Sequence, residues 1–304
     1  MPQRVAYTMK FGVCVPNYGA TSSVEAVSAI ALEAEALGYD SVWTTDHVLM
    51  PRNSGTPYER ILDSIATLAY LAPQTRNVRL GVSSLIIAMR NPAVVAKQLA
   101  SIDAFSGGRV LLAIGVGWNQ REFTSVGSDF HDRGRRVDES IRLLKSLWRG
   151  ETDFESTLLP QKFEDAIFEP RPASKEIEIW IGGNSEPAMR RAANLGDAWH
   201  PNVYPIDTFR DLVAQFRRLS PKAAEKRICV RLGLDMQAEK AEYVGPQGDR
   251  RVRLTGNMEG NEKTIADLEE LGVSFAVIVP SPEGKTPLQE QLEGIRAFAS
   301  KFVS

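Results

Sequence analysis

The stretch VRLGVSSLIIAMRNPAVVAKQLASIDAFSGGRVLLAIGVG, residues 78–117, holds two short apolar runs separated by a segment with helical spacing. The runs, 78–86 and 110–117, are rich in Val, Leu and Ile, as strands buried on both faces are. Between them, Asn91-Pro92 places a capping side chain before a proline at the first helical position, and Ser106-Gly107-Gly108 ends the helix. A strand, a crossover helix and a second strand in this order predict two parallel strands.

The same alternation runs through the rest of the chain. Further apolar runs lie at 11–17, 41–46, 177–183, 197–202, 228–234 and 275–280. Helical spacing covers 23–37, 58–72, 92–105, 131–149, 185–195, 205–219, 261–271 and 287–302. Eight strands alternating with eight helices predict an α/β fold of the (β/α)8 TIM barrel type, whereas an open doubly wound sheet would not need eight equal units.

Two excursions interrupt the alternation, at about 150–176 after the fourth strand and 235–260 after the seventh. The second is polar and rich in glycine, so we expect a mobile loop there. We expect one barrel domain over residues 1–304, with 1–8 as an N-terminal extension.

Charge and composition exclude several partners. Lys and Arg number 36 and Asp and Glu number 38, so the net charge of −2 gives no electrostatic reason to expect nucleic acid or an anionic membrane. No apolar run approaches the length of a membrane-spanning helix, and the N-terminus lacks the apolar core of a signal peptide.

The only cysteines, Cys14 and Cys229, do not suggest a disulfide framework. A cytoplasmic protein is expected.

Candidate catalytic residues stand at strand ends, where TIM barrels carry their active sites. Asp46 and His47 end the second run, and His200 ends the sixth. Histidine is the common proton carrier near neutral pH. Asp46 could orient the His47 ring, although neighbouring residues on a strand point to opposite faces. In the alternative, His47 only hydrogen-bonds loop backbone.

Three other barrel chemistries lack a necessary part. The histidines, at 47, 131 and 200, are scattered rather than set at metal-ligand spacing, so no metal is expected. No lysine follows the first position of a strand, which argues against a Schiff-base aldolase. Nothing marks a sugar platform between paired carboxylates, as a glycosidase would need.

Two glycine-rich segments follow strands: Gly115, Val116 and Gly117 after the fourth, and Gly182, Gly183, Asn184 and Ser185 after the fifth. The first offers bare backbone that a flat ring could approach closely. The second opens a helix, so it is either a phosphate cradle or an ordinary strand-to-helix turn. Ser83 and Ser84 place hydroxyls in a buried strand, where a bound polar ligand would supply the partners that they need.

Taken together, the motifs resemble the bacterial luciferase-like superfamily of flavin- and deazaflavin-dependent oxidoreductases, and most closely its branch that uses coenzyme F420. The resemblance is carried by these segments: MKFGVCVPNYG (9–19), YDSVWTTDHVLMP (39–51), residues 78–123, RGRRVDESIRLLKSLW (133–148), FEPRP (168–172) and IWIGGNSEPAMRRAANLGDAWHP (179–201).

The resemblance implies roles for individual residues. Asp46 and His47 match the pair at which the family's deazaflavin reductases place a histidine beside the reactive edge of the ring. Ser83-Ser84 match a position that commonly has a non-prolyl cis peptide backing the ring. The segment from Gly115 to Gly117 matches backbone that lines the ring, and the segment from Gly182 to Ser185 matches the binding site of the phosphate-bearing tail.

In one respect the chain departs from the family that it resembles. Family dehydrogenases of sugar phosphates and alcohols carry a glutamate just past the fourth-strand glycines, where this chain has Trp118-Asn119, and the nearest acid is Glu122. This argues against a sugar phosphate or simple alcohol as substrate and leaves reduction of an activated double bond open.

The expected function is F420-dependent hydride transfer to or from a small organic substrate, with His47 moving the proton and Asp46 supporting the site. The alternatives are an FMN-dependent monooxygenase fed by a separate flavin reductase and a non-catalytic flavin-binding barrel. A homodimer is expected, with any flavin or F420 reductase acting only as a supplier of diffusible cofactor.

Overall fold

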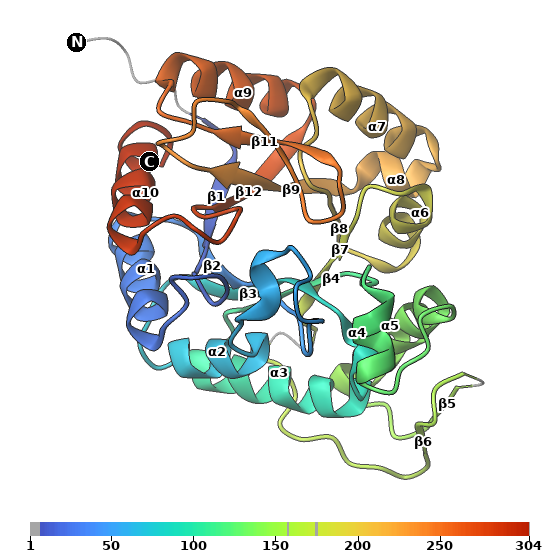
Figure 1. Cartoon of the computed structure of the whole chain (residues 1–304). Helices are drawn as coiled ribbons and strands as arrows, with labels where there is room; N and C mark the ends of the chain where they lie inside the picture. Colours follow the sequence, from blue (N-terminus) through green and yellow to red (C-terminus); the bar gives the residue numbers. More distant parts are fainter. Residues whose placement is uncertain (1–6, 157, 174–175, 304) are drawn as a thin grey trace.

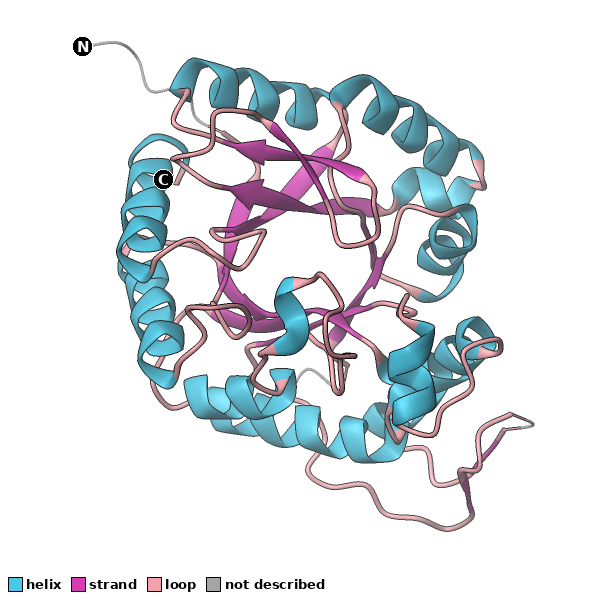
Figure 2. Cartoon of the chain, in the orientation of Figure 1, coloured by secondary structure: helices cyan, strands magenta, loops and turns pink. Residues whose placement is uncertain are grey.

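The computed structural model describes residues 7–156, 158–173 and 176–303. Its central feature is a closed ring of parallel strands surrounded by helices (Figures 1 and 2). The barrel strands are β1 (Lys10–Cys14), β2 (Ser41–Thr44), β3 (Arg79–Leu85), β4 (Val110–Ile114), β7 (Glu178–Gly182), β8 (Ala198–His200), β9 (Arg227–Leu234) and β12 (Val273–Val279). Each pairs in parallel with its neighbours, and the β8–β9 and β12–β1 pairs close the ring. The predicted (β/α)8 barrel is confirmed.

The ring of helices around the barrel contains the predicted helical segments. The helices are α1 (Val24–Ala36), η1 (Pro57–Glu59), α2 (Ser64–Leu71), η2 (Ile87–Met89), α3 (Pro92–Ser106), α4 (Gln120–Ser125), α5 (Arg133–Arg149), α6 (Glu186–Leu195), α7 (Ile206–Arg218), α8 (Pro221–Glu225), α9 (Met258–Glu270) and α10 (Leu288–Phe302). The cap signals hold at α3, where Asn91 accepts from the N–H groups of Ala93 and Val94 and Gly107 adopts the left-handed conformation.

The helix predicted at 58–72 is divided in two, and this part of the prediction is wrong. Only a short 3-10 turn, η1, and the later α2 are helical. Ile61, between them, forms a β-bridge with Tyr18, and Asp63 caps α2 by accepting from the Ala66 N–H. The bridge joins this segment to the loop after β1.

Both faces of the barrel strands are buried, which explains their apolar composition. On β2, Val42 faces the core between strands and helices, whereas Trp43 joins a second cluster inside the barrel with residues such as Trp180 and Phe275. Gly81 makes room for this cluster, since a Cβ there would lie 2.3 Å from the Trp43 ring. The barrel interior around Trp43 is therefore a packed core. Any ligand must bind beyond it, toward the C-terminal ends of the strands.

The two excursions each contain a hairpin. The first carries β5 (Phe154–Glu155) paired with β6 (Lys162–Phe163), and it projects away from the barrel (Figure 1). The second carries β10 (Glu242–Val244) antiparallel to β11 (Arg250–Leu254), and β11 extends the barrel sheet by pairing with β9. A short hairpin therefore takes up part of the loop expected at 235–260. In the described part of the chain, no helix is both long and apolar enough to cross a membrane.

Candidate active site

A cavity of about 440 Å³ opens at the C-terminal ends of the barrel strands. Every site residue predicted from the sequence lines it: Asp46, His47, Ser83, Ser84, Gly115, Val116, Gly117, Gly182, Gly183, Asn184 and Ser185. Other lining residues are Thr45, Tyr58, Ile86, Trp118, Ala188, His200, Asn202, Tyr204 and Arg231, together with Pro246, Gln247, Asp249 and Arg251 from the second excursion. The strand ends predicted to share one face of the barrel therefore share one cavity.

His47 follows β2, and its imidazole is held by a carboxylate from another part of the chain. The Nδ1 atom lies 2.8 Å from Oε2 of Glu122, which is 75 residues away. The ring stacks on Tyr58 with centroids 4.4 Å apart and meets the edge of Trp118 at 6.0 Å. Among the residues that the structure describes, nothing hydrogen-bonds Nε2, and His47 lines the cavity. The second nitrogen is available to a ligand.

Glu122 is a candidate functional residue that the sequence interpretation did not include in the site. It lies in the first turn of α4, which Asn119 caps, and its side chain reaches back over the loop after β2. Its other oxygen, Oε1, accepts from the N–H of Val48 at 2.6 Å. Burial raises the pKa of the carboxyl, but the hydrogen bond and charge of His47 and the neighbouring backbone N–H groups outweigh it and hold the pKa below its ordinary value. Glu122 is therefore ionised at neutral pH.

Because an ionised carboxylate can only accept, Nδ1 of His47 must carry the hydrogen in that contact. The neutral ring then has a lone pair on Nε2, and the protonated ring has an N–H there. The Glu122 contact thus fixes both the orientation of the ring and its tautomer.

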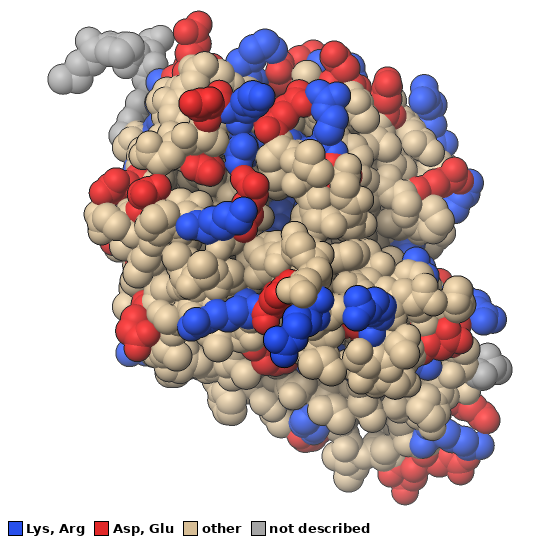
Figure 3. Space-filling model, in the orientation of Figure 1, with Lys and Arg blue, Asp and Glu red and all other residues tan. Residues whose placement is uncertain are grey.

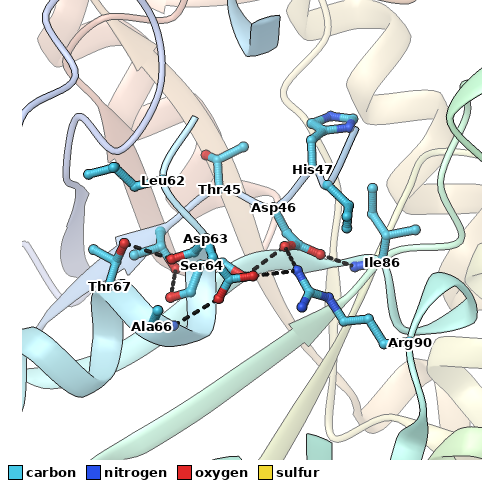
Figure 4. A network of polar contacts seen from close by, with 12 residues as sticks. Thr45, Asp46, His47, Leu62, Asp63, Ser64, Ala66, Thr67, Ile86 and Arg90 are labelled. Atoms are coloured by element: carbon cyan, nitrogen blue, oxygen red, sulfur yellow. Dashed lines mark hydrogen bonds and ion pairs between the residues drawn. The ribbon is translucent and has the colours of Figure 1, made fainter. Parts of the chain in front are cut away.

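Asp46 takes part in a different network, on the opposite side of the strand end (Figure 4). Its carboxylate accepts from the Ser64 hydroxyl at 2.7 Å, the Ile86 N–H at 2.9 Å and the Arg90 guanidinium at 2.6 Å. Figure 4 shows the His47 ring turned away from this carboxylate. The two neighbours in sequence therefore do not form a pair. Asp46 instead links the end of β2 to α2 and to the segment after β3.

A chain of hydrogen bonds forms the floor of the cavity and runs from Arg231 through Ser83 to His200. Arg231 donates to the hydroxyl of Ser83 at 3.1 Å and to that of Thr45 at 3.0 Å. The Ser83 hydroxyl lies 2.8 Å from Nε2 of His200, whose Nδ1 contacts the Cys229 carbonyl. Since a carbonyl only accepts, Nδ1 of His200 carries the hydrogen and Nε2 accepts from Ser83. Burial lowers the pKa of His200 to about 4, so this ring is neutral at pH 7.

Beside this floor, the Ser83-Ser84 peptide bond is cis, as expected from the resemblance. Two glycines lie against Ser84. A Cβ added to Gly182 would lie 2.6 Å from its hydroxyl oxygen, and one added to Gly115 would lie 3.2 Å from its Cβ. Gly117 has a φ of +75°, which favours glycine, and a Cβ there would lie 2.6 Å from Phe123. These positions form a smooth surface on one side of the cavity.

The segment after β7 turns directly into α6. Asn184 is tied to the next strand end, because its amide donates to the Asn202 carbonyl at 2.8 Å and accepts from the Asn202 N–H at 3.0 Å. Ser185 is the N-cap residue of α6, but its side chain makes no capping hydrogen bond. The first N–H groups of α6 are therefore not capped by that hydroxyl.

Metal-ligand groups of three or more His, Cys, Asp or Glu are absent from the described residues. His131 lies outside the cavity lining, and its backbone N–H bonds to the Asp129 carboxylate. On the face of the molecule that carries the loops over the barrel, acidic and basic side chains are interspersed (Figure 3). This surface shows no extended field of one sign.

Comparison with known proteins places these features in a family. Residues 9–243 match the family described as luciferase-like monooxygenase. An uncharacterized protein of Mycobacterium tuberculosis is 29% identical over 290 residues, which are 90% of this chain and 93% of that protein.

Two characterised relatives differ in their cofactor. The chain is 29% identical over 226 residues to an F420-dependent glucose-6-phosphate dehydrogenase of Amycolatopsis mediterranei, covering 69% of this chain and 66% of the other. It is 33% identical over 150 residues to an FMNH2-dependent dimethylsulfone monooxygenase of Pseudomonas putida, covering 48% of this chain and 40% of the other.

Among solved structures, an F420-dependent secondary alcohol dehydrogenase in complex with an F420-acetone adduct has the same fold. The TM-score is 0.78 at 16% identity, over 97% of this chain and 98% of the other. Because the family match covers most of the chain, the protein is a member of the luciferase-like monooxygenase family.

Proposed function

We propose that the chain is an oxidoreductase that uses coenzyme F420 for hydride transfer to or from a small organic substrate. The observation that carries the proposal is the His47–Glu122 pair, with Nε2 of His47 available at the cavity. A hydride transfer that makes or consumes an O–H or C–H bond needs a proton donor or acceptor beside the reacting atom. A non-catalytic barrel has no use for a buried carboxylate that orients a histidine in this way.

The cavity fits a flat ring system. Ser84, Gly115 and Gly182 form one wall with no side chain projecting between them, since a Cβ on either glycine would crowd Ser84. A planar ring can approach such a wall closely, and His47 and Tyr58 also line the cavity.

The same cavity fits a phosphate at one end. Gly183, Ser185 and Ala188 line it at the start of α6, whose first N–H groups Ser185 leaves uncapped. Free N–H groups and the positive end of the helix dipole favour a phosphate there. Asn184 would hold this turn in place through its two bonds to Asn202 rather than bind the ligand itself.

When bound, the deazaflavin supplies a carbon centre that gives or takes a hydride and reacts poorly with oxygen. His47 moves the accompanying proton at Nε2. In the direction of substrate reduction its imidazolium donates, and in the direction of oxidation its lone pair accepts. Glu122 stabilises the imidazolium through Nδ1 and holds the loop at Val48. Asp46 acts as a positioning residue that fixes the end of β2.

The part of the cavity near His47 has aromatic walls from Tyr58 and Trp118. Glu122 is engaged by His47 and by backbone N–H groups, so it is not free to act on substrate directly. These features favour a substrate with an activated double bond and an apolar body over a sugar phosphate.

The test is equilibrium binding of the purified protein to oxidised F420 and to oxidised FMN, each followed by fluorescence quenching. We expect F420 to bind at micromolar concentration and FMN at least about tenfold more weakly. This preference would direct substrate screening to anaerobic hydride transfer.

The opposite preference would contradict the proposal. It would support an FMN-dependent monooxygenase, the alternative suggested by the relative of Pseudomonas putida. Oxygen consumption with a separate flavin reductase would then be measured. Failure to bind either molecule would reject both enzymatic functions.

A further inference from the structure

Arg231 is a charged residue in the middle of β9 for which the proton chemistry at His47 has no use. Its side chain lines the cavity floor and makes hydrogen bonds across the barrel to β3 and to the end of β2. One nitrogen donates to both the carbonyl and the hydroxyl of Ser83, and the other donates to the Thr45 hydroxyl. These acceptors fix the position of the guanidinium, but all of them are neutral.

The acidic residues around the cavity already have other partners. Asp46 forms an ion pair with Arg90, and Glu122 is hydrogen-bonded to Nδ1 of His47. Asp249 forms one with Arg251. Across residues 7–156, 158–173 and 176–303, no carboxylate lies within ion-pair distance of Arg231.

Several other ionisable groups near Arg231 are neutral at pH 7. They are the thiol of Cys14 on β1, the phenols of Tyr18 and Tyr243, and the imidazole of His200 on β8. Burial raises the pKa of Cys14, Tyr18 and Tyr243, and it lowers that of His200. Since arginine stays protonated, the cavity floor carries one uncompensated positive charge.

An uncompensated charge in a partly buried site is costly unless a counter-charge accompanies it. Three hydrogen bonds hold the guanidinium at the cavity floor. The counter-charge therefore has to enter the cavity with a ligand. Because Arg231 contacts Ser83, next to the smooth wall at Ser84, it lies beside the surface on which a flat ring fits.

We propose that Arg231 is the counter-cation for the negatively charged ring system of the bound cofactor. The inference rests on the proposed function for the position of the ring, and it adds the electrostatic state in which the ring is bound. In oxidised F420 the ring hydroxyl ionises and its charge spreads over the conjugated system. A fixed cation beside the ring stabilises that ionised form relative to the neutral form.

The test is an optical pH titration of oxidised F420, free and bound, because ionisation of the ring hydroxyl changes its visible absorption. With the wild-type protein, we expect the bound ring to ionise about one pH unit or more below the free coenzyme, a tenfold preference for the ionised form. Arg231→Met should abolish most of this shift, and Arg231→Lys should keep it.

A matched control removes a paired cation from the same cavity. The double variant Arg251→Met, Asp249→Asn leaves the net charge of the lining unchanged and should retain the wild-type shift. An unshifted ring in the wild-type protein would overturn the proposal whether or not Arg231→Met folds. An equal shift in wild type and Arg231→Met would overturn it as well.

Failure of the proposed function gives a different result. If the protein binds FMN instead of F420, the charge on Arg231 is tested by comparing oxidised FMN, which has a neutral ring, with reduced FMN, which has an anionic ring. The wild-type protein should bind the reduced form about tenfold more tightly, and Arg231→Met should lose that ratio. Equal affinities of the wild-type protein for the two forms would reject the role of Arg231.

Discussion

His47 and His200 both stand at strand ends, both are buried, and both line the same cavity, yet their surroundings differ. His200 has a partner on each nitrogen, the Ser83 hydroxyl and the Cys229 carbonyl, and burial lowers its pKa to about 4. His47 has an ionised carboxylate on one nitrogen and no partner among the described residues on the other.

In the proposed function, position on the fold is therefore not enough to make a histidine a proton carrier. His200 cannot exchange a proton without breaking the hydrogen-bond chain of the cavity floor. His47 can gain or lose one at Nε2 while Glu122 keeps its orientation. The partners of each ring, and not its position, decide between a structural and a catalytic role.

The largest expected effect concerns Asp46, the sequence neighbour of His47. Asp46→Ala should lower the free energy of unfolding by about 3–5 kcal/mol, because Arg90 would be left without its buried partner and the Ile86 N–H without its acceptor. Urea unfolding measures this. The control is Asp63→Asn, which removes the more exposed ion pair to Arg90 and should cost under about 1 kcal/mol. Equal effects of the two variants would contradict the structural role given to Asp46.

The second effect is a pH dependence that belongs to His200. The pKa of His200 is taken as 6.5 in the unfolded chain and is about 4 in the folded protein. The unfolded chain therefore binds more protons than the folded protein between these two pH values. Its contribution to stability is complete above pH 6.5 and should fall by about 3 kcal/mol as the pH decreases to 4.

Urea unfolding across this pH range checks the His200 prediction. His200→Gln should be less stable than wild type at pH 7 but should lack this part of the acid dependence. If the variant loses stability between pH 6.5 and 4 as steeply as the wild type, His200 is not the group that titrates.

A smaller effect is expected at Glu122. Glu122→Gln should lower the free energy of unfolding at neutral pH by about 1–3 kcal/mol, because charge-assisted bonds to His47 and Val48 are weakened. Since the folded pKa of Glu122 lies below 4.5, its contribution is present above that value and is lost as the pH falls through the folded pKa.

Urea unfolding of wild type and Glu122→Gln, at pH 7 and at acid pH, tests the direction of this pH dependence. The difference in stability between wild type and Glu122→Gln should shrink below pH 4.5. A difference that grows toward acid would mean that the carboxyl is protonated in the folded state at neutral pH.

The barrel and the lining of the cavity could be predicted because both depend on local patterns. Alternating apolar runs and helix caps specify parallel strands, and parallel strands bring residues such as His47, Ser84 and Gly182 to one face regardless of their separation in sequence.

The pairing of side chains could not be predicted in the same way. Glu122 lies on α4, a short helix that no predicted segment included, and its contact with His47 depends on how that helix packs over the loop after β2. Asp46 was the nearer acid in sequence, but it faces α2. Arg231 did leave a signal, because a charged residue interrupts the apolar run 228–234, where a buried strand would otherwise exclude it.

The central claim is that His47 moves the proton. It is tested most directly by measuring the oxidation of bound reduced F420 in a single turnover, with a substrate that screening has shown the wild-type protein to accept. The variants to compare are His47→Gln and His200→Gln. We expect His47→Gln to slow this step by about 10²–10⁴-fold with little change in F420 affinity, and His200→Gln to slow it less than about tenfold. Unchanged turnover in His47→Gln, or an equal loss in both variants, would contradict the account.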